Sequence, residues 1–438
     1  MTKPPGTSRI RGAGLRSVHR AGGGVAADCG LYLIGAVFAG FTAVASTLPA
    51  HRAWGSIAFF GYAAISVLAV AQLLTRRRSA LSRIALVGAG WLVTTVAPLL
   101  AQAVQRAGGH PHRAQEEVTV VELAAGRLLD TGVPYLTRDQ ISQSAEPLLS
   151  YLPYQPAMAV FGLPRALAPE MWWSDARICF ALVTAVAVTA GLWLLRDGGV
   201  ADDLLIRAAQ AVAVLPVCAL TLATGGDDLP VLAMSLLALA LVSRGRWGAA
   251  GIAIGVAAAL KLFAWPVAAV LLIHALATGR RAFTTLAAPA LGIPVATLLP
   301  VVAISPAAVW ENLVRFPLGM GLVKSPAASP LPGYLITETL PYGRAVAATL
   351  LGAAAAALGI WLLRRPPRTS GAAAAVSATG LLIAILLMPA TRFGYLLYPA
   401  GYAVWAVALS RAPARPERTT GHREPAQPLP AGTAPPDS

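Results

Sequence analysis

RGRWGAAGIAIGVAAALKLFAWPVAAVLLIHALATGRR, residues 244–281, sets the fold class of this chain. Arginines lie at both ends of this stretch, Arg244 and Arg246 at the start and Arg280 and Arg281 at the end. Lys261 is the one formal charge in the apolar run between them. Lys and Arg are retained on the cytoplasmic side of a bilayer, so both ends of the run face the same side. The run therefore crosses the membrane twice, as two helices, and Lys261 lies at the turn between them on the outer face.

Composition extends this interpretation to the whole chain. Of its 438 residues, 56% are hydrophobic and only 12% are charged, about half the roughly 25% that is typical of a soluble domain. Apolar runs suited to membrane helices, which need about 20 residues, recur throughout. The sequence predicts an all-α polytopic membrane protein of about twelve transmembrane helices, at residues 29–49, 54–74, 84–104, 176–195, 205–223, 229–243, 248–262, 264–277, 284–304, 345–363, 371–389 and 394–410.

The charge distribution orients these helices. With both termini cytoplasmic and 151–167 not crossing, 22 of the 34 Lys and Arg but only 7 of the 19 Asp and Glu face the cytoplasm. The whole net charge of +15 then lies inside, as the positive-inside rule requires. If 151–167 crossed, the later basic loops would face outward. This segment, with Pro153 and Pro156, is therefore expected to be re-entrant or interfacial.

We expect a multi-pass protein of the plasma (inner) membrane that is embedded in the lipid bilayer and binds no nucleic acid, because no basic groove with interleaved aromatic residues is present. The expected regions are a basic cytoplasmic tail (1–28), three N-terminal transmembrane helices (29–104), an outer loop with an amphipathic helix and the re-entrant segment (105–175), a transmembrane core with a second outer loop at 305–343 (176–410), and a disordered cytoplasmic tail (411–438).

Polar residues outside the tails gather on the outer face in this topology. They are Asp227 and Asp228 at the start of a span, Lys261, Glu311, Arg315 and Lys324 in the second outer loop, and Arg392. Charges at span ends are often simply solvated, and Lys261 has two open interpretations. Its long side chain can snorkel to the interface, or its ammonium can bind a phosphate.

EEVTVVELAAGRLLDTGVPY, residues 116–135, predicts an amphipathic helix on the outer membrane surface. Apolar residues recur at helical spacing, while Glu122, Arg127 and Asp130 are expected to face the other way, and Gly and Pro end the helix. Glu116 and Glu117 stand at its N-terminus, where the helix dipole favours carboxylates. Each glutamate can therefore either cap the helix N-terminus or belong to a catalytic or binding site.

No metal and no cofactor are expected. His110 and His112 are spaced as an HxH pair, but no further ligands follow at a set spacing. The three cysteines, Cys29, Cys179 and Cys218, lie in or beside apolar runs and are interpreted as small core residues.

The 116–135 segment resembles the first outer loop of the polyprenol-phosphate-mannose-dependent mannosyltransferases, glycosyltransferase family 87 of the GT-C membrane superfamily. The matching positions are Ala124, Ala125, Leu128, Leu129, Gly132 and Tyr135. Glu117 falls where the family has its catalytic Asp, and Val121 replaces an aromatic residue. Four later segments resemble family motifs in the same order: YLPYQPAMAVFGLP (151–164), TGGDDLPVLAMSLLALAL (224–241), WGAAGIAIGVAAALKLFAWP (247–266) and PATRFGYLLYP (389–399).

The resemblance implies a GT-C-like fold and an inverting transfer of a sugar, with mannose the expected sugar. The donor would be a polyprenyl-phosphate sugar, and the acceptor a glycolipid or glycan on the outer face. Glu117 would be the catalytic base. The donor phosphate would be bound by Lys261, Arg392 and Arg315. The sugar or acceptor hydroxyls would be bound by Asp227, Asp228, Glu116 and Tyr135.

Two other function classes stay open. A transporter or flippase of lipid-linked sugars is the main alternative, although transporters tend to show internal repeats and charges near the bilayer midplane. A non-catalytic membrane scaffold or partner subunit is the other, because Glu stands in place of the family Asp.

Overall fold

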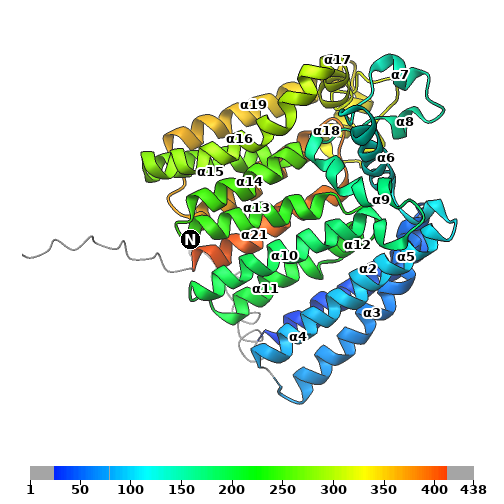
Figure 1. Cartoon of the computed structure of the whole chain (residues 1–438). Helices are drawn as coiled ribbons and strands as arrows, with labels where there is room; N and C mark the ends of the chain where they lie inside the picture. The colour runs from blue at the N-terminus through cyan, green and yellow to red at the C-terminus, as the bar shows by residue number, and fades with distance from the viewer. Residues whose placement is uncertain (1–23, 78, 412–438) are drawn as a thin grey trace, which may run out of the picture.

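A computed structural model describes residues 24–77 and 79–411 of the chain. Within these ranges the chain forms helices and connecting segments, with one isolated β-bridge between Ala328 and Thr391. Figure 1 shows the long helices packed side by side, with the shorter helices α6, α7, α8, α17 and α18 gathered at one end. The all-α fold of a polytopic membrane protein is therefore confirmed.

Eight helices in the described part of the chain are long and apolar enough to cross a bilayer. They are α2 (Val25–Ala45), α3 (Pro49–Leu74), the continuous run of α4 (Ala80–Trp91) and α5 (Ala97–Ala107), α10 (Ala176–Asp197), α16 (Arg280–Ile304), α19 (Gly343–Arg364), α20 (Ser370–Leu387) and a last run, Phe393–Ser410, that contains α21 (Leu397–Ser410). A ninth is possible if α11 (Asp202–Ala213) and α12 (Pro216–Thr224), bent by 41° at their junction, form one span.

Three further apolar helices are shorter than a standard crossing: α13 (Asp228–Ser243), α14 (Trp247–Leu260) and α15 (Trp265–Thr278). Each of the twelve apolar runs in the sequence thus became one helix or one bent pair. The total of about twelve spans stays a prediction, because length alone supports eight or nine.

The two loops expected on the outer face lie at the same end of the bundle (Figure 1). The first contains α6 (Glu116–Thr131), α7 (Arg138–Ser142) and α8 (Pro147–Ser150), and the second contains α17 (Pro306–Trp310) and α18 (Pro332–Thr339). Which end faces the cytoplasm is a prediction from charge. Most of the terminal tails expected there, residues 1–23 and 412–438, lie outside the described residues.

The segment 151–167 does not form a continuous helix. It runs from an extended stretch into a 3-10 turn, Pro156–Gly162, and then into α9 (Leu163–Leu167). Gly162 packs directly on α6, since a Cβ there would lie 2.4 Å from the backbone oxygen of Val121. A broken segment buried against protein agrees with the expectation that this stretch does not cross the membrane.

Small residues let the core helices approach closely, as is usual between membrane helices. On α14, a Cβ at Gly251 would lie 2.4 Å from the oxygen of Leu286, and one at Gly255 would lie 2.4 Å from the oxygen of Pro289. Helix α16 therefore contacts the backbone of α14 directly. Helix α13 is buried on nearly all sides at the centre of the bundle.

The first helix begins earlier than the sequence analysis placed it. Asp28, expected in the cytoplasmic tail, is buried in α2 and accepts hydrogen bonds from Arg83 Nε (2.6 Å) and Arg207 Nη1 (2.6 Å). Gln210 Nε2 donates a further bond to it (2.9 Å). A buried charge needs such partners, and these partners join α2 to α4 and α11.

The topology can be tested by cysteine labelling from outside the cell, in a background without the three native cysteines. A membrane-impermeant thiol reagent should label Gln140→Cys and Thr339→Cys, which are exposed positions in the two outer loops. It should not label Arg368→Cys, an exposed position at the other end of the bundle, unless the membrane is permeabilised. Labelling of position 368 in intact cells would show that the protein has the opposite orientation in the membrane.

Candidate active site

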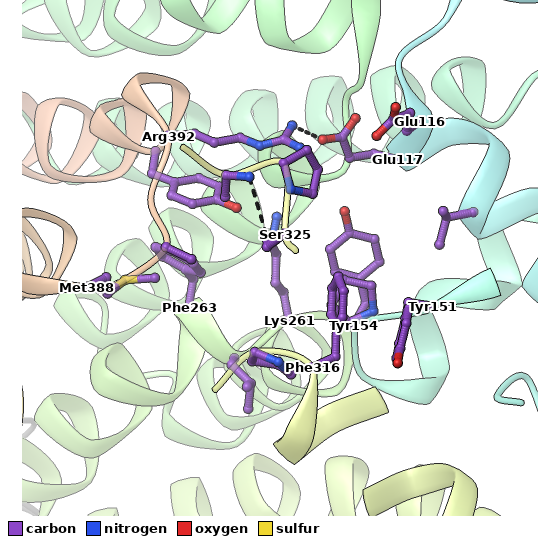
Figure 2. A pocket seen from close by; sticks show the side chains of 18 of the residues that line it. Glu116, Glu117, Tyr151, Tyr154, Lys261, Phe263, Phe316, Ser325, Met388 and Arg392 are labelled. Carbon is purple, nitrogen blue, oxygen red and sulfur yellow. Dashed lines mark hydrogen bonds and ion pairs between the residues drawn. The ribbon is translucent and has the colours of Figure 1, made fainter. Parts of the chain in front are cut away.

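A cavity of about 220 Å³ lies at the loop-bearing end of the bundle. It is bounded by the start of α6, the segment 148–154, the turn after α14, the loop 316–327 and the segment 388–395. Its lining includes the charged residues Glu116, Glu117, Lys261 and Arg392 and the aromatic residues Tyr151, Tyr154, Phe263, Phe316 and Tyr395. Figure 2 shows the charged side chains converging on this space from different segments.

Helix α6 places both glutamates at the cavity. It begins at Glu116, where the amide of the preceding Gln115 donates to the oxygen of Thr224 (2.9 Å), and it ends at Gly132 in the left-handed conformation (φ 74°). The positive end of the helix dipole faces the first turn and stabilises the two carboxylates. The expected helix and its stop signal are confirmed.

Glu117 forms an ion pair with Arg392, drawn as a dashed line in Figure 2. The β-bridge holds the backbone beside Arg392: the Thr391 amide donates to the Ala327 oxygen (2.9 Å), and the Ser329 amide donates to the Thr391 oxygen (2.9 Å). The second outer loop therefore fixes the backbone next to Arg392. Two predicted site residues separated by 275 positions meet in this pair.

Lys261 lies at the turn between α14 and α15, as expected. Its ammonium donates to Asp227 Oδ2 (2.7 Å) and to Asp228 Oδ1 (2.5 Å), and Asp228 also accepts a bond from the Tyr398 hydroxyl (2.8 Å). Both aspartates are buried beneath Lys261 at the start of α13. The structure thus brings these three predicted residues together, with only Lys261 among them lining the cavity.

Two other predicted residues lie behind the cavity wall. Tyr135 is buried, and its hydroxyl donates to the backbone oxygen of Tyr154 (2.8 Å). Arg315 lies in the second outer loop with Nε 3.2 Å from Glu311 Oε2. Neither lines the cavity, so neither is placed to contact a ligand inside it.

The wall formed by the second outer loop depends on Tyr151. Its hydroxyl donates to Glu311 Oε1 (2.8 Å) and accepts a bond from the Leu322 amide (2.8 Å), while its ring stacks on Phe316 with centroids 4.1 Å apart. Burial raises the pKa of Tyr151, and the adjacent Glu311 carboxylate raises it further. The phenol therefore stays protonated and keeps donating at neutral pH.

A buried charge cluster around Glu122 of α6 was not predicted from the sequence. Arg106 of α5 binds both oxygens of Glu122 (2.8 and 2.6 Å) and reaches Asp175 Oδ2 (3.2 Å). Arg177 Nη2 donates to the same Asp175 oxygen (2.7 Å). Glu122 was expected only to face away from the apolar side of the helix. It is buried, because Arg106 of α5 offsets the cost of burying its carboxylate. Two features of the sequence could have indicated this cluster: Arg106 at the end of one predicted span and Asp175 at the start of the next.

No group of three or more His, Cys, Asp or Glu side chains that could hold a metal ion occurs among residues 24–77 and 79–411.

The model of glycosyltransferase family 87 matches residues 151–389, more than half of the chain. This chain belongs to glycosyltransferase family 87. In this family 87 protein, Glu117 precedes the matched range and Arg392 follows it, while Asp227, Asp228 and Lys261 lie within it. No curated protein sequence matches the chain.

Two solved structures resemble the family 87 protein at low identity. Apo ArnT from Cupriavidus metallidurans aligns with a TM-score of 0.43 and 18% identity, over 68% of this chain and 55% of that chain. ArnT from the same organism bound to undecaprenyl phosphate aligns with a TM-score of 0.43 and 19% identity, over 74% and 60%. The family 87 protein therefore spans less than two thirds of the length of ArnT.

The buried cluster behind α6 predicts a large loss of stability for Glu122→Ala. Removing one partner of a buried ion pair costs about 3–5 kcal/mol, here because Arg106 loses its bidentate partner. Thermal unfolding of the detergent-solubilised protein measures this as a lower Tm. The matched control is Glu338→Ala. The partner of Glu338 is Lys324, whose Nζ lies 3.8 Å from Glu338 Oε2 and whose side chain is 86% exposed. This control substitution should therefore change the free energy of unfolding by under about 1 kcal/mol. Equal Tm shifts for the two variants would contradict the prediction.

Proposed function

We propose that this family 87 protein transfers a sugar, with mannose the expected one, from a polyprenyl-phosphate donor to a hydroxyl of a glycolipid or glycan acceptor. The observation that supports the proposal is the pairing of Glu117 with Arg392 in one cavity at the loop-bearing end of a helix bundle. A lipid-linked donor can reach such a site from the bilayer, and an acceptor can reach it from the outer face. We place the protein in the plasma (inner) membrane with cytoplasmic termini.

The reaction needs a base and a partner for the leaving phosphate. The acceptor oxygen attacks the anomeric carbon, its proton passes to the Glu117 carboxylate, and the bond from that carbon to the phosphate oxygen breaks on the opposite face of the sugar. The configuration at the anomeric carbon is therefore inverted. Arg392 stabilises the negative charge that collects on the departing phosphate, and its planar guanidinium suits phosphate oxygens.

The Glu117–Arg392 pair has to open during this cycle. A phosphate that binds Arg392 replaces Glu117 as the partner of the guanidinium, and the released carboxylate is then free to accept a proton. The pair is partly exposed, with 28% of the Arg392 side chain and 13% of the Glu117 side chain accessible. Exchange of partners therefore takes place without uncovering a fully buried charge.

Glu116 is the second carboxylate at the cavity, and it lies one helical position before Glu117. Consecutive residues on a helix point in different directions, so both cannot occupy the same position relative to the acceptor. We assign Glu116 to binding acceptor or sugar hydroxyls, since carboxylates accept hydrogen bonds strongly.

Replacement of the base is the first test of this function. Glu117→Gln keeps the size of the side chain and removes its ability to take a proton, so turnover of a polyprenyl-phosphate sugar should fall by about 10²- to 10⁴-fold. Glu116→Gln should lower turnover far less. Product formation by the purified variants measures both, and Glu117→Asp tests whether the family residue works with the shorter reach. A wild-type rate in Glu117→Gln with an inactive Glu116→Gln would assign the base to the neighbouring residue.

Replacement of the cation is the second test. Arg392→Gln should weaken donor binding by about tenfold or more, since a hydrogen bond to a charged group contributes about 1.5–3 kcal/mol, and should leave acceptor binding nearly unchanged. The comparison variant is Arg315→Gln, because this arginine pairs with Glu311 outside the cavity lining. Its donor affinity should stay within about twofold of wild type. A larger loss in Arg315→Gln than in Arg392→Gln would move the phosphate site to the second outer loop.

A further inference from the structure

Three aromatic rings border the cavity and surround the ammonium of Lys261. Its Nζ lies 4.9 Å from the ring centre of Tyr154, 5.4 Å from that of Tyr395 and 5.8 Å from that of Phe263. These distances are within the range of cation–π attraction. Figure 2 shows Lys261 between Phe263 and Tyr154. We call Tyr154, Phe263 and Tyr395 the aromatic floor.

The aromatic floor is held from behind by buried contacts. Phe263 stacks on Tyr398 (5.0 Å, 13° between planes), and the Tyr398 hydroxyl donates to Asp228. Tyr154 is fixed through its backbone, because its oxygen accepts the bond from Tyr135 and the next amide, of Gln155, donates to the oxygen of Leu260 (3.1 Å). The rings are therefore set in place before any ligand enters, which lowers the entropic cost of binding.

The charge beneath the floor does not suit a phosphate. Counted with both carboxylates ionised, Asp227, Asp228 and Lys261 together carry one net negative charge. Two of the three N–H donors of the ammonium are already used by the aspartates. A phosphate placed here would meet like charge, whereas the Arg392 side chain is 28% exposed and carries a positive charge at the cavity.

The same surroundings suit a sugar ring. The faces of aromatic rings carry negative charge density, and the C–H groups on one face of a pyranose are apolar and slightly positive. In glycosyl transfer the anomeric carbon also gains positive charge in an oxocarbenium-like transition state. Aromatic faces and a net negative cluster stabilise that charge, while they would repel the leaving phosphate.

We infer that the aromatic floor is the subsite for the pyranose ring of the donor, and that Lys261 is a positioning residue that holds the floor together with Asp227 and Asp228. The inference rests on the proposed function and gives Lys261 a role other than the phosphate binding expected from the sequence. The phosphate would lie at Arg392, and the sugar would extend from there over the floor.

Two probes separate this role from phosphate binding: undecaprenyl phosphate, which has no sugar, and undecaprenyl phosphate mannose. Binding of each to the full-length protein in nanodiscs is measured for wild type, Phe263→Leu and Lys261→Met. Phe263→Leu removes one ring of the floor and disturbs no charge. The matched control is Phe60→Leu, because Phe60 on α3 is 71% exposed and does not line the cavity.

Phe263→Leu and Lys261→Met should each weaken binding of the sugar-bearing probe by about three- to tenfold, the range expected for one lost aromatic contact. Binding of the bare lipid phosphate should stay within about twofold of wild type, and Phe60→Leu should match wild type with both probes. A loss of affinity for bare undecaprenyl phosphate in Lys261→Met would make this lysine a phosphate ligand and overturn the assignment. Unchanged binding of both probes by Phe263→Leu would overturn it as well, even where Lys261→Met fails to fold.

The same binding experiment also tests the proposed function separately from the sugar subsite. A wild-type protein that binds neither probe would overturn the proposed function, and the sugar subsite with it. A wild-type protein that binds both, combined with Phe263→Leu that loses nothing, would overturn only the subsite.

Discussion

The pairing of Lys261 with Asp227 and Asp228 is the interaction on which the loop-bearing end of the bundle depends. It joins the start of α13 to the turn between α14 and α15, and Tyr398 of α21 adds a fourth helix through Asp228. A charge left unpaired at this depth would cost several kcal/mol. The helices therefore have to end where their charges can meet, and this accounts for a cluster of short helices at the centre of a bundle of long ones.

Burial separates the two charge clusters of the cavity into different roles. The Lys261 side chain is 6% exposed and surrounded by rings, so its partners are fixed and its effect is on the shape of the cavity. The Arg392–Glu117 pair is more accessible, and its members can exchange each other for a ligand. The charged groups with fixed partners and those whose partners can exchange are thus distinguished by solvent access, although both clusters pair a cation with carboxylates.

The sequence predicted the elements of this structure better than their contacts. Apolar runs located the helices, the charge at their ends located the turns, and the N-terminal glutamates of 116–131 marked the start of α6, because each of these signals is local. The role of Glu122 could not be predicted in this way, since its partner Arg106 is on another helix. Asp227 and Asp228 were expected to contact a sugar, and the sequence did not predict their ion pairs with Lys261, which lies 34 and 33 positions away. Pairings of this kind depend on how the helices pack, and packing is not encoded in any one segment.

The separation of Glu117 and Arg392 along the chain has a consequence for how the protein is made. Membrane segments leave the ribosome in order, and Arg392 emerges only after nearly every other helix. Until then Glu117 has no guanidinium partner, and the part of the cavity lining formed by residues 388–395 is absent. The cavity is thus completed at the end of biogenesis, because the carboxylate of Glu117 is synthesised long before the guanidinium that pairs with it.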